Sequence, residues 1–195
     1  AYPADQPGEY HVPGIWSDPW PCVLGALQSS RSVEQAAEVL PDVPLRIGLA
    51  TEHDLPAILD LQRLAFSEEA QRYRDPALAP MTQTLEQLVA EARSSVVLTA
   101  RVEGWLVGSV RGRIDGQGIG HIGRLVVHPE WRRRGVASKL MDTAEASLSK
   151  CRAIRVFTGD RSDHSLTLYR RRGYVPCGRM SNGSHDLVLL ERVSG

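Results

Sequence analysis

The chain has 195 residues, of which 23 are Lys or Arg and 23 are Asp or Glu, so its formal net charge is zero. This length suits one well-buried domain with an appendage better than two full domains. A neutral chain has no overall attraction for nucleic acid or for an anionic membrane, so any functional charge must be local.

The three cysteines, Cys22, Cys151 and Cys177, are far apart and form no C-x-x-C pair. Their number and spacing argue against a disulfide framework and against a cysteine zinc site, so we expect no metal and a cytoplasmic location. No apolar run approaches the roughly 20 residues that cross a bilayer. The sequence contains no positively charged segment followed by an apolar one, so it gives no indication of an intact signal peptide.

Residues 1–44 differ from the rest because seven prolines interrupt them, with Tyr2, Tyr10, Trp16 and Trp20 in between. One short helix is predicted within them, from Ser32 to Leu40. Proline-rich linkers usually lack such aromatic residues. We therefore expect an extension that lies against the main domain, residues 45–195, or against a partner chain. Its role as an arm, a lid or a homodimer contact stays open.

The main domain begins with a predicted strand, LRIGLA, followed by a helix over TEHDLPAILDLQRLAF. Thr51 and Asp54 form a capping-box pattern before that helix, and Pro56 is tolerated in its first turn. We expect a polar loop from Ser67 to Pro80 and then an amphipathic helix over TQTLEQLVAEAR.

Two strands are predicted between residues 94 and 114, with a turn at Glu103-Gly104. A glycine-rich turn, the strand HIGRLVVH and a helix from Gly135 to Ser149 follow. The chain then gives the strand AIRVFTG, the helix SDHSLTLYRRRG, and the strands YVPCGR and HDLVLLERV. We expect Arg170, Arg171 and Arg172 to form an exposed last helical turn, with Gly173 ending the helix.

The predicted order of elements is β-α-α-β-β-β-α-β-α-β-β. The strand-helix-strand segment over residues 120–157 should be a parallel, right-handed crossover, whereas the short connections elsewhere favour antiparallel pairs. The fold class is therefore α/β (mixed α+β), with a mixed, mostly antiparallel sheet and helices on both faces.

The stretch HPEWRRRGVASKL places three arginines and a glycine where a strand passes into a helix. The first N–H groups of a helix have no intrahelical partner, and the helix dipole adds positive charge there. Gly135 lets an anion approach the backbone, and the arginines add charge-assisted hydrogen bonds. The junction is typical of an anion site, and a pyrophosphate is the natural size match.

The segment Arg132 to Ala137 matches [QR]-x-x-G-x-[GA], the pyrophosphate loop of the GNAT superfamily of N-acetyltransferases. LVVHPEWRRRGVASKLM resembles the central strand, loop and helix of that family, and TEHDLPAILDLQRLAF resembles its first helix. YRRRGY, from Tyr169 to Tyr174, resembles the family's Y-x-x-x-G-[FY] signature. The resemblance covers about residues 45–192 and implies a GNAT-type fold with splayed central parallel strands.

The resemblance implies that acetyl-CoA binds as a cosubstrate, with no metal. Leu125, Val126 and Val127 would pair with the pantetheine arm, and the Val127 amide would polarise the thioester carbonyl. The amides of residues 133–138 would hold the pyrophosphate. The expected cofactor-binding residues of this loop are Arg132, Arg133, Arg134, Gly135, Val136, Ala137 and Ser138.

Tyr169 matches the family tyrosine that protonates the leaving thiolate, although a tyrosine packed in the core would give the same pattern. Ser162 stands where the family often has an asparagine that contacts the cofactor arm; it can donate one hydrogen bond and cap the helix. No acidic residue occupies the family's usual base positions. His121 is the nearest titratable candidate, followed by His164 and Glu103.

The resemblance therefore favours an N-acetyltransferase that transfers acetyl to a primary amine by direct attack in a ternary complex. The acceptor pocket is expected between Ser67–Pro80 and Arg179–His185, whose residues leave the acceptor and the preferred acyl length open. A non-catalytic, acyl-CoA-binding regulatory module is the alternative. A nucleic-acid patch is disfavoured, because net basic charge and interleaved aromatic residues are missing.

Overall fold

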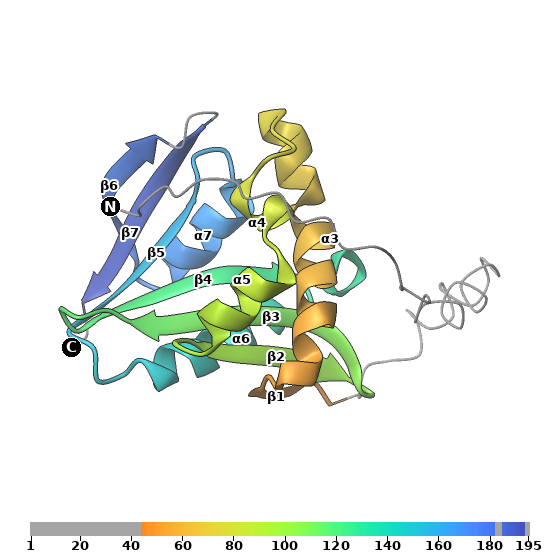
Figure 1. Ribbon diagram of the computed structural model, residues 1–195. Coiled ribbons are helices and arrows are strands. Elements are labelled where there is room, and N and C mark those ends of the chain that lie inside the picture. Colours follow the sequence, from red (N-terminus) through yellow and green to blue (C-terminus); the bar gives the residue numbers. More distant parts are fainter. Residues whose placement is uncertain (1–43, 182–184, 194–195) are drawn as a thin grey trace. The chain divides into compact units, whose positions relative to one another are not determined.

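The computed structural model describes residues 44–181 and 185–193, and Figure 1 shows its ribbon. These residues form a seven-stranded sheet with the order β1-β2-β3-β4-β5-β7-β6. The strands are β1 (Arg46–Leu49), β2 (Val96–Val102), β3 (Trp105–Ile114), β4 (Ile119–Val127), β5 (Ala153–Gly159), β6 (Val175–Ser181) and β7 (Asp186–Val193). Of these neighbours, β4 and β5 run parallel and the others antiparallel. The predicted mixed sheet and parallel crossover are confirmed.

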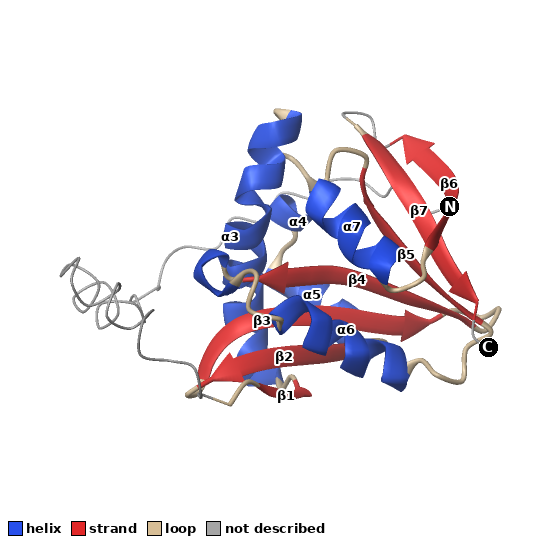
Figure 2. Cartoon of the chain, turned by 180° about the vertical axis from the view of Figure 1, so that it is seen from behind, coloured by secondary structure: helices blue, strands red, loops and turns tan. Residues whose placement is uncertain are grey.

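Helices lie on both faces of the sheet, as predicted. They are α3 (Leu55–Tyr73), α4 (Ala79–Thr82), α5 (Leu85–Ala92), α6 (Val136–Ser147) and α7 (Asp163–Arg171), with short 3₁₀ turns η1 (Glu52–Asp54) and η2 (Pro129–Trp131). Helices α3 and α5 cover one face in Figure 1, and α6 and α7 cover the other in Figure 2. No helix of the described residues has the length and apolar character that a membrane span requires.

Helix α3 is longer than the sequence indicated. The predicted capping box of Thr51 and Asp54 is present at η1, but the expected loop from Ser67 to Pro80 is wrong, because the helix continues to Tyr73. Ala70 and Tyr73 continue the buried face that Gln62 belongs to, about two and three turns further on, and both are buried. Their burial outweighs the polar composition around them.

The β2–β3 hairpin turns where the sequence predicted. Glu103 and Gly104 have φ angles of 50° and 87°, the left-handed pair that a two-residue hairpin loop requires. The turn pairs Val102 with Trp105, and a register shift between Arg101 and Ala100 then brings Ala100 opposite Gly108.

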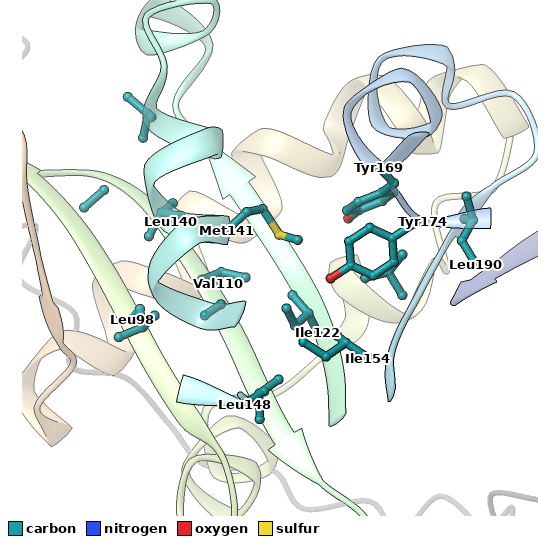
Figure 3. Packing of buried hydrophobic residues seen from close by; sticks show 14 of the residues in the cluster. Leu98, Val110, Ile122, Leu140, Met141, Leu148, Ile154, Tyr169, Tyr174 and Leu190 are labelled. Atoms are coloured by element: carbon teal, nitrogen blue, oxygen red, sulfur yellow. The ribbon is translucent and has the colours of Figure 1, made fainter. Parts of the chain in front are cut away.

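The main core lies between the sheet and helices α6 and α7. Leu140 and Met141 of α6 are both fully buried. Figure 3 shows Met141 directed toward the Tyr169–Tyr174 pair, whereas Leu140 lies toward β3. Helix α6 approaches closely because Gly108 of β3 has no side chain: a Cβ there would lie 2.9 Å from Leu140 Cδ1. The close contact fixes the height of α6, and of its first turn, above the sheet.

A buried arginine ties α3 and α5 to the opposite face. Arg111 of β3 is 3% exposed, and it donates to Gln62 Oε1 at 2.6 Å and to Glu91 Oε2 at 2.7 Å. Burial lowers the pKa of Arg111, and the Glu91 charge opposes that shift. The network explains why Gln62 lies on the otherwise apolar face of α3.

The end of α7 corrects one expectation. Arg170 and Arg171 are exposed as predicted, but Arg172 is not, because it donates through Nε to Glu145 Oε1 of α6 at 2.9 Å. Gly173 has a φ of 82° and follows the last turn, as predicted for a residue that ends a helix.

The N-terminal extension predicted over residues 1–44 and its helix at 32–40 lie almost wholly outside the described residues. The chain divides into the units 1–42 and 43–195, and the fold described above belongs to the second.

Candidate active site

Strands β4 and β5 separate in the middle of the sheet. Their pairing ends at Ile122 and Val156, although β4 continues to Val127 and β5 to Gly159. The carboxyl halves of the two strands therefore form a split with unpaired edges, which we call the β4–β5 split.

A bulge in β4 lies where the split begins. Arg124 has a φ of 52°, and the β3–β4 register shifts there, because Ser109 pairs with Val126 while Arg111 pairs with Gly123. A bulge leaves one extra residue unpaired and bends its strand. The bend directs the end of β4 away from β5.

Backbone amides of β4 face the split. The His128 amide donates to the Val107 carbonyl at 2.9 Å and so faces β3. Because successive amides of an extended strand face alternate sides, those of Val127 and Leu125 face β5. Beyond Ile122 there is no β5 partner for them, so the split offers hydrogen-bond donors to a third, extended chain.

The first turn of α6 follows β4 and presents further free amides. Arg133 and Gly135 have φ angles of 59° and 79°, and Gly135 is the N-cap residue without any side-chain cap. Among the described residues, no protein group accepts from the amides of Val136, Ala137 or Ser138. A Cβ on Gly135 would meet no atom within 4 Å. The surroundings fit an anion that approaches the backbone closely.

The three arginines of this loop differ in their contacts. Arg132 forms a two-point ion pair with Glu68 of α3, at 2.7 and 2.8 Å. Arg134 lies over the Trp131 ring, 5.0 Å from its centre, and Arg133 is exposed. Arg133 and Arg134 can therefore reach an anion without giving up an ion pair, whereas Arg132 would have to leave Glu68.

Tyr169 lies on the inner face of α7, 5% exposed, with its ring edge-on to Tyr174 at 5.9 Å (Figure 3). Burial raises the pKa of its hydroxyl, and the nearby charge of Glu69 raises it further. No protein group within the described ranges hydrogen-bonds to this hydroxyl. Tyr169 thus remains protonated at neutral pH and has a proton to donate.

Ser162 precedes α7, but the prediction that its side chain caps the helix is wrong. The N-cap has no side-chain hydrogen bond, and the Ser162 hydroxyl instead donates to Glu69 Oε1 of α3 at 2.6 Å. Its ψ of 65° departs from the extended backbone of a usual cap, and a carboxylate is the stronger acceptor.

His121 lies in the paired half of β4, opposite Arg113 and Arg155. Its Nε2 is 2.7 Å from Asp115 Oδ2. His121 and Val127 are six residue steps apart, about 20 Å along an extended strand. The structure does not bring His121 together with the amides of the split.

The two predicted acceptor walls meet, although the first is a helix and not a loop. Tyr73 at the end of α3 stacks on His185, which precedes β7, with ring centres 4.2 Å apart. The Tyr73 hydroxyl donates to Asp160 at 2.9 Å and accepts from the Arg161 amide at 2.8 Å. Residues 182–184 of the second wall lie outside the described residues.

Sequence reasoning missed Glu69. It is separated from Ser162 by 93 residues, and nothing in a run of charged residues marks which one turns inward. The helical spacing from Phe66 to Tyr73 was the available signal, since it continues α3 and places Glu69 beside its buried face.

Solved acetyltransferases share this fold. The chain is similar to the PaiA N-acetyltransferase from Thermoplasma acidophilum in complex with coenzyme A, with a TM-score of 0.67 and 17% identity over 77% of this chain and 99% of that one. It is also similar to YncA from Salmonella typhimurium with its cofactor acetyl-CoA, with a TM-score of 0.62 and 19% identity over 77% and 94% of the two chains. The ribosomal-protein-S18-alanine N-acetyltransferase from Escherichia coli gives a TM-score of 0.64 and 12% identity over 77% and 94%. These likenesses define the class of the fold.

The family follows from the sequence itself. A model described as the acetyltransferase (GNAT) family matches residues 55–174, more than half of the chain. The match runs from α3 through the β4–β5 split and the arginine loop to the end of α7. The chain belongs to the GNAT family of acetyltransferases, as its motifs predicted.

Proposed function

We propose that this protein is an acetyl-CoA-dependent N-acetyltransferase that transfers an acetyl group to a primary amine by direct attack in a ternary complex. The observation that carries the proposal is the β4–β5 split, which opens beside the free amides at the start of α6. PaiA and YncA, which share the fold and were solved with coenzyme A or acetyl-CoA, support this choice of substrate.

The start of α6 would hold the pyrophosphate. Its free amides, the helix dipole and the open backbone at Gly135 favour a doubly charged anion. The side chains of Arg133 and Arg134 would add charge-assisted hydrogen bonds. Arg132 would contribute only after exchanging Glu68 for a phosphate oxygen, because its guanidinium is already paired.

The split would hold the pantetheine arm as an added strand along Leu125, Val126 and Val127. The amides of Leu125 and Val127 are its available donors. A donor fixed before the reaction begins stabilises negative charge on the thioester oxygen at little reorganisation cost. We assign that role to Val127, at the end of β4.

Tyr169 would donate a proton to the departing thiolate. The hydroxyl is protonated at neutral pH, and burial raises its pKa further above neutrality. Within residues 44–181 and 185–193, no protein group competes for its proton. Ser162 is less suited to contact the cofactor arm, since its hydroxyl donates to Glu69 and its amide to the Gly159 carbonyl. We propose instead that Ser162 positions Glu69.

Two measurements on the full chain test the function. Calorimetry should detect coenzyme A binding, and a panel of primary amines should release free thiol from acetyl-CoA. Binding without thiol release on any amine would favour the acyl-CoA-binding regulatory module. The absence of binding would overturn both.

A tyrosine pair offers a matched test of the acid. Tyr169→Phe should lower kcat about 100-fold, as loss of a general acid does, with unchanged coenzyme A affinity. Tyr174→Phe is the matched control, because the Tyr174 ring contacts Tyr169. It removes a hydroxyl that donates to Glu145 at 3.1 Å and should leave kcat unchanged. Equal effects of the two variants would contradict the assignment.

A further inference from the structure

We propose that Glu69 binds the acceptor as an ammonium ion and removes the proton that must leave before its nitrogen can attack. The inference rests on the acetyltransferase function proposed above. It also names the acceptor class, which is an aliphatic primary amine that is cationic at neutral pH.

Helix α3 crosses the open end of the β4–β5 split. Glu68 pairs with Arg132 in the loop that follows β4, and the next residue, Glu69, accepts from Ser162 in the loop that follows β5. Consecutive residues of one helix thus contact both sides of the split. The Glu69 carboxylate lies at the β5 side of that opening, where a Cβ on Gly159 would be 2.8 Å from its Oε1.

Glu69 also lies near the proposed acid. Its negative charge raises the pKa of Tyr169, which requires the carboxylate to be close to the phenol. Side chains of a helix lean toward its N-terminus, so the Tyr169 ring leans toward the end of α7 where Ser162 and Glu69 meet. The thiolate that Tyr169 protonates and the nitrogen that replaces it are bonded to the same carbon, so the base must lie in this region.

Glu69 differs from the other partly buried glutamates among the described residues because it has no cation as a partner. Glu91, Glu145 and Glu191 each form an ion pair with an arginine. Within residues 44–181 and 185–193, Glu69 has the Ser162 hydroxyl as its partner and no ion pair. A partly desolvated carboxylate favours a counter-charge, and an ammonium ion would supply it.

The groups around Glu69 leave this need unmet. They include two more acids, Glu68 and Asp160, and three arginines. Of the arginines, Arg132 pairs with Glu68, and the Arg161 guanidinium lies 5.8 Å above the Tyr73 ring and not on Glu69. From α3 they are Glu68, Arg72 and Tyr73, from the segment after β5 Asp160 and Arg161, from α7 Tyr169, from the loop after β4 Arg132, and before β7 His185.

The proton and electron balance of the reaction follows. The ammonium ion gives one proton to Glu69, and the freed lone pair forms the C–N bond at the thioester carbon. The C–S bond breaks, its electron pair stays on sulfur, and Tyr169 protonates that sulfur. The tyrosinate recovers a proton from the acylated nitrogen, and Glu69 releases its proton to water.

The test compares two acceptors in two variants of the full chain. An alkylamine is protonated at pH 7 and needs the base, whereas an arylamine is already neutral. For Glu69→Gln we expect kcat/KM to fall about 100-fold with the alkylamine and to stay within threefold with the arylamine. With the alkylamine the variant's rate should also rise tenfold per pH unit as free amine accumulates. As a control, Glu86→Gln makes the same chemical change at an exposed position of α5 and should leave the rates with both amines unchanged.

Each outcome decides between the two proposals. Equal losses on both acceptors, or an unchanged pH profile in Glu69→Gln, would overturn the role of Glu69 while the parent still turns over. If the parent binds no coenzyme A, the acetyltransferase proposal itself fails. If Glu69→Gln does not bind coenzyme A, Ser162→Ala gives the test, since it frees Glu69 without removing it and should lower the alkylamine rate alone.

Discussion

The tetrapeptide Arg-Arg-Arg-Gly occurs twice, and its two copies do opposite things. The first copy, residues 132–135, leads into α6, and the second, residues 170–173, ends α7. Both glycines have a positive φ, 79° and 82°. In the second copy the Gly173 amide donates to Arg170 and the Tyr174 amide to Tyr169, which closes the helix as a Schellman motif.

The two copies differ in the end of the helix that each one adjoins. At the C-terminus of α7 the arginines oppose the negative end of the dipole, and Arg172 finds Glu145, so the charge stabilises the fold. At the N-terminus of α6 the same charge adds to the positive end and is unfavourable until an anion arrives. Identical residues therefore form a structural junction in one place and a candidate binding site in the other.

The largest expected effect breaks the structural copy. Glu145 is 10% exposed and accepts from Arg172 and Arg192, so Glu145→Ala removes the ion pair of Arg192 and leaves Arg172 paired only with the exposed Asp142. We expect a loss of about 3–5 kcal/mol in the free energy of unfolding, measured in urea. Asp142→Asn removes only the exposed partner of Arg172 and should cost less than about 1 kcal/mol.

The same network predicts acid sensitivity. Burial would raise the pKa of Glu145, but Arg172 and Arg192 hold it below its ordinary value of 4.5. A depressed pKa stabilises the fold above the unfolded value, and that contribution is lost as the pH falls below it. Glu145→Ala should therefore flatten the acid limb of the stability curve, and an unchanged limb would contradict the network.

Exchanging the two glycines for valine sharpens the comparison. Gly135→Val and Gly173→Val both force a branched residue into a left-handed backbone, at a cost of about 1–2 kcal/mol each. Only Gly135→Val should also weaken coenzyme A binding, by about 100-fold if two charge-assisted hydrogen bonds are lost. Calorimetry on both variants measures the coenzyme A affinity. Equal affinities in the two variants would contradict an anion site at the first copy.

Charge reversal should give opposite signs at the two copies. Arg133→Glu should stabilise the unliganded fold by about 0.3–1 kcal/mol, and Arg171→Glu should destabilise it by a similar amount. Arg133→Glu should also lower coenzyme A affinity about tenfold, as the loss of one charge-assisted contact implies. Thermal unfolding with and without coenzyme A measures both effects, and shifts of the same sign would argue against the dipole explanation.

The smallest effect concerns His121. Its hydrogen bond lowers the pKa of Asp115 to about 2, so His121→Ala should reduce stability above the ordinary Asp value, with the difference vanishing as the pH falls toward 2. We expect kcat to stay within about twofold, whereas loss of a general base costs about 100-fold or more. A large drop in kcat with unchanged stability would indicate that His121 takes part in the reaction.

The sequence predicted what depends on local pattern. The order of elements was predictable from helical spacing and from the Glu103-Gly104 turn. The start of α6 was predictable from the glycine after the arginines. All three signals depend on neighbours within a few residues. The partners of Arg172 and Ser162 could not be predicted in this way. Glu145 and Glu69 lie 27 and 93 residues away from them, and only the packed fold decides which charged side chain is turned inward.

Because Gly108 has no side chain, it limits which substitutions the neighbouring positions can accept during evolution. Leu140 and Val136 occupy the space that a Cβ would need, at 2.9 and 3.0 Å, so an alanine there would push the whole of α6 outward. A smaller residue at position 140 could restore the spacing, and the two positions should then vary together. In a mutational library, we expect Gly108→Ala to survive chiefly beside Leu140→Val or Leu140→Ala.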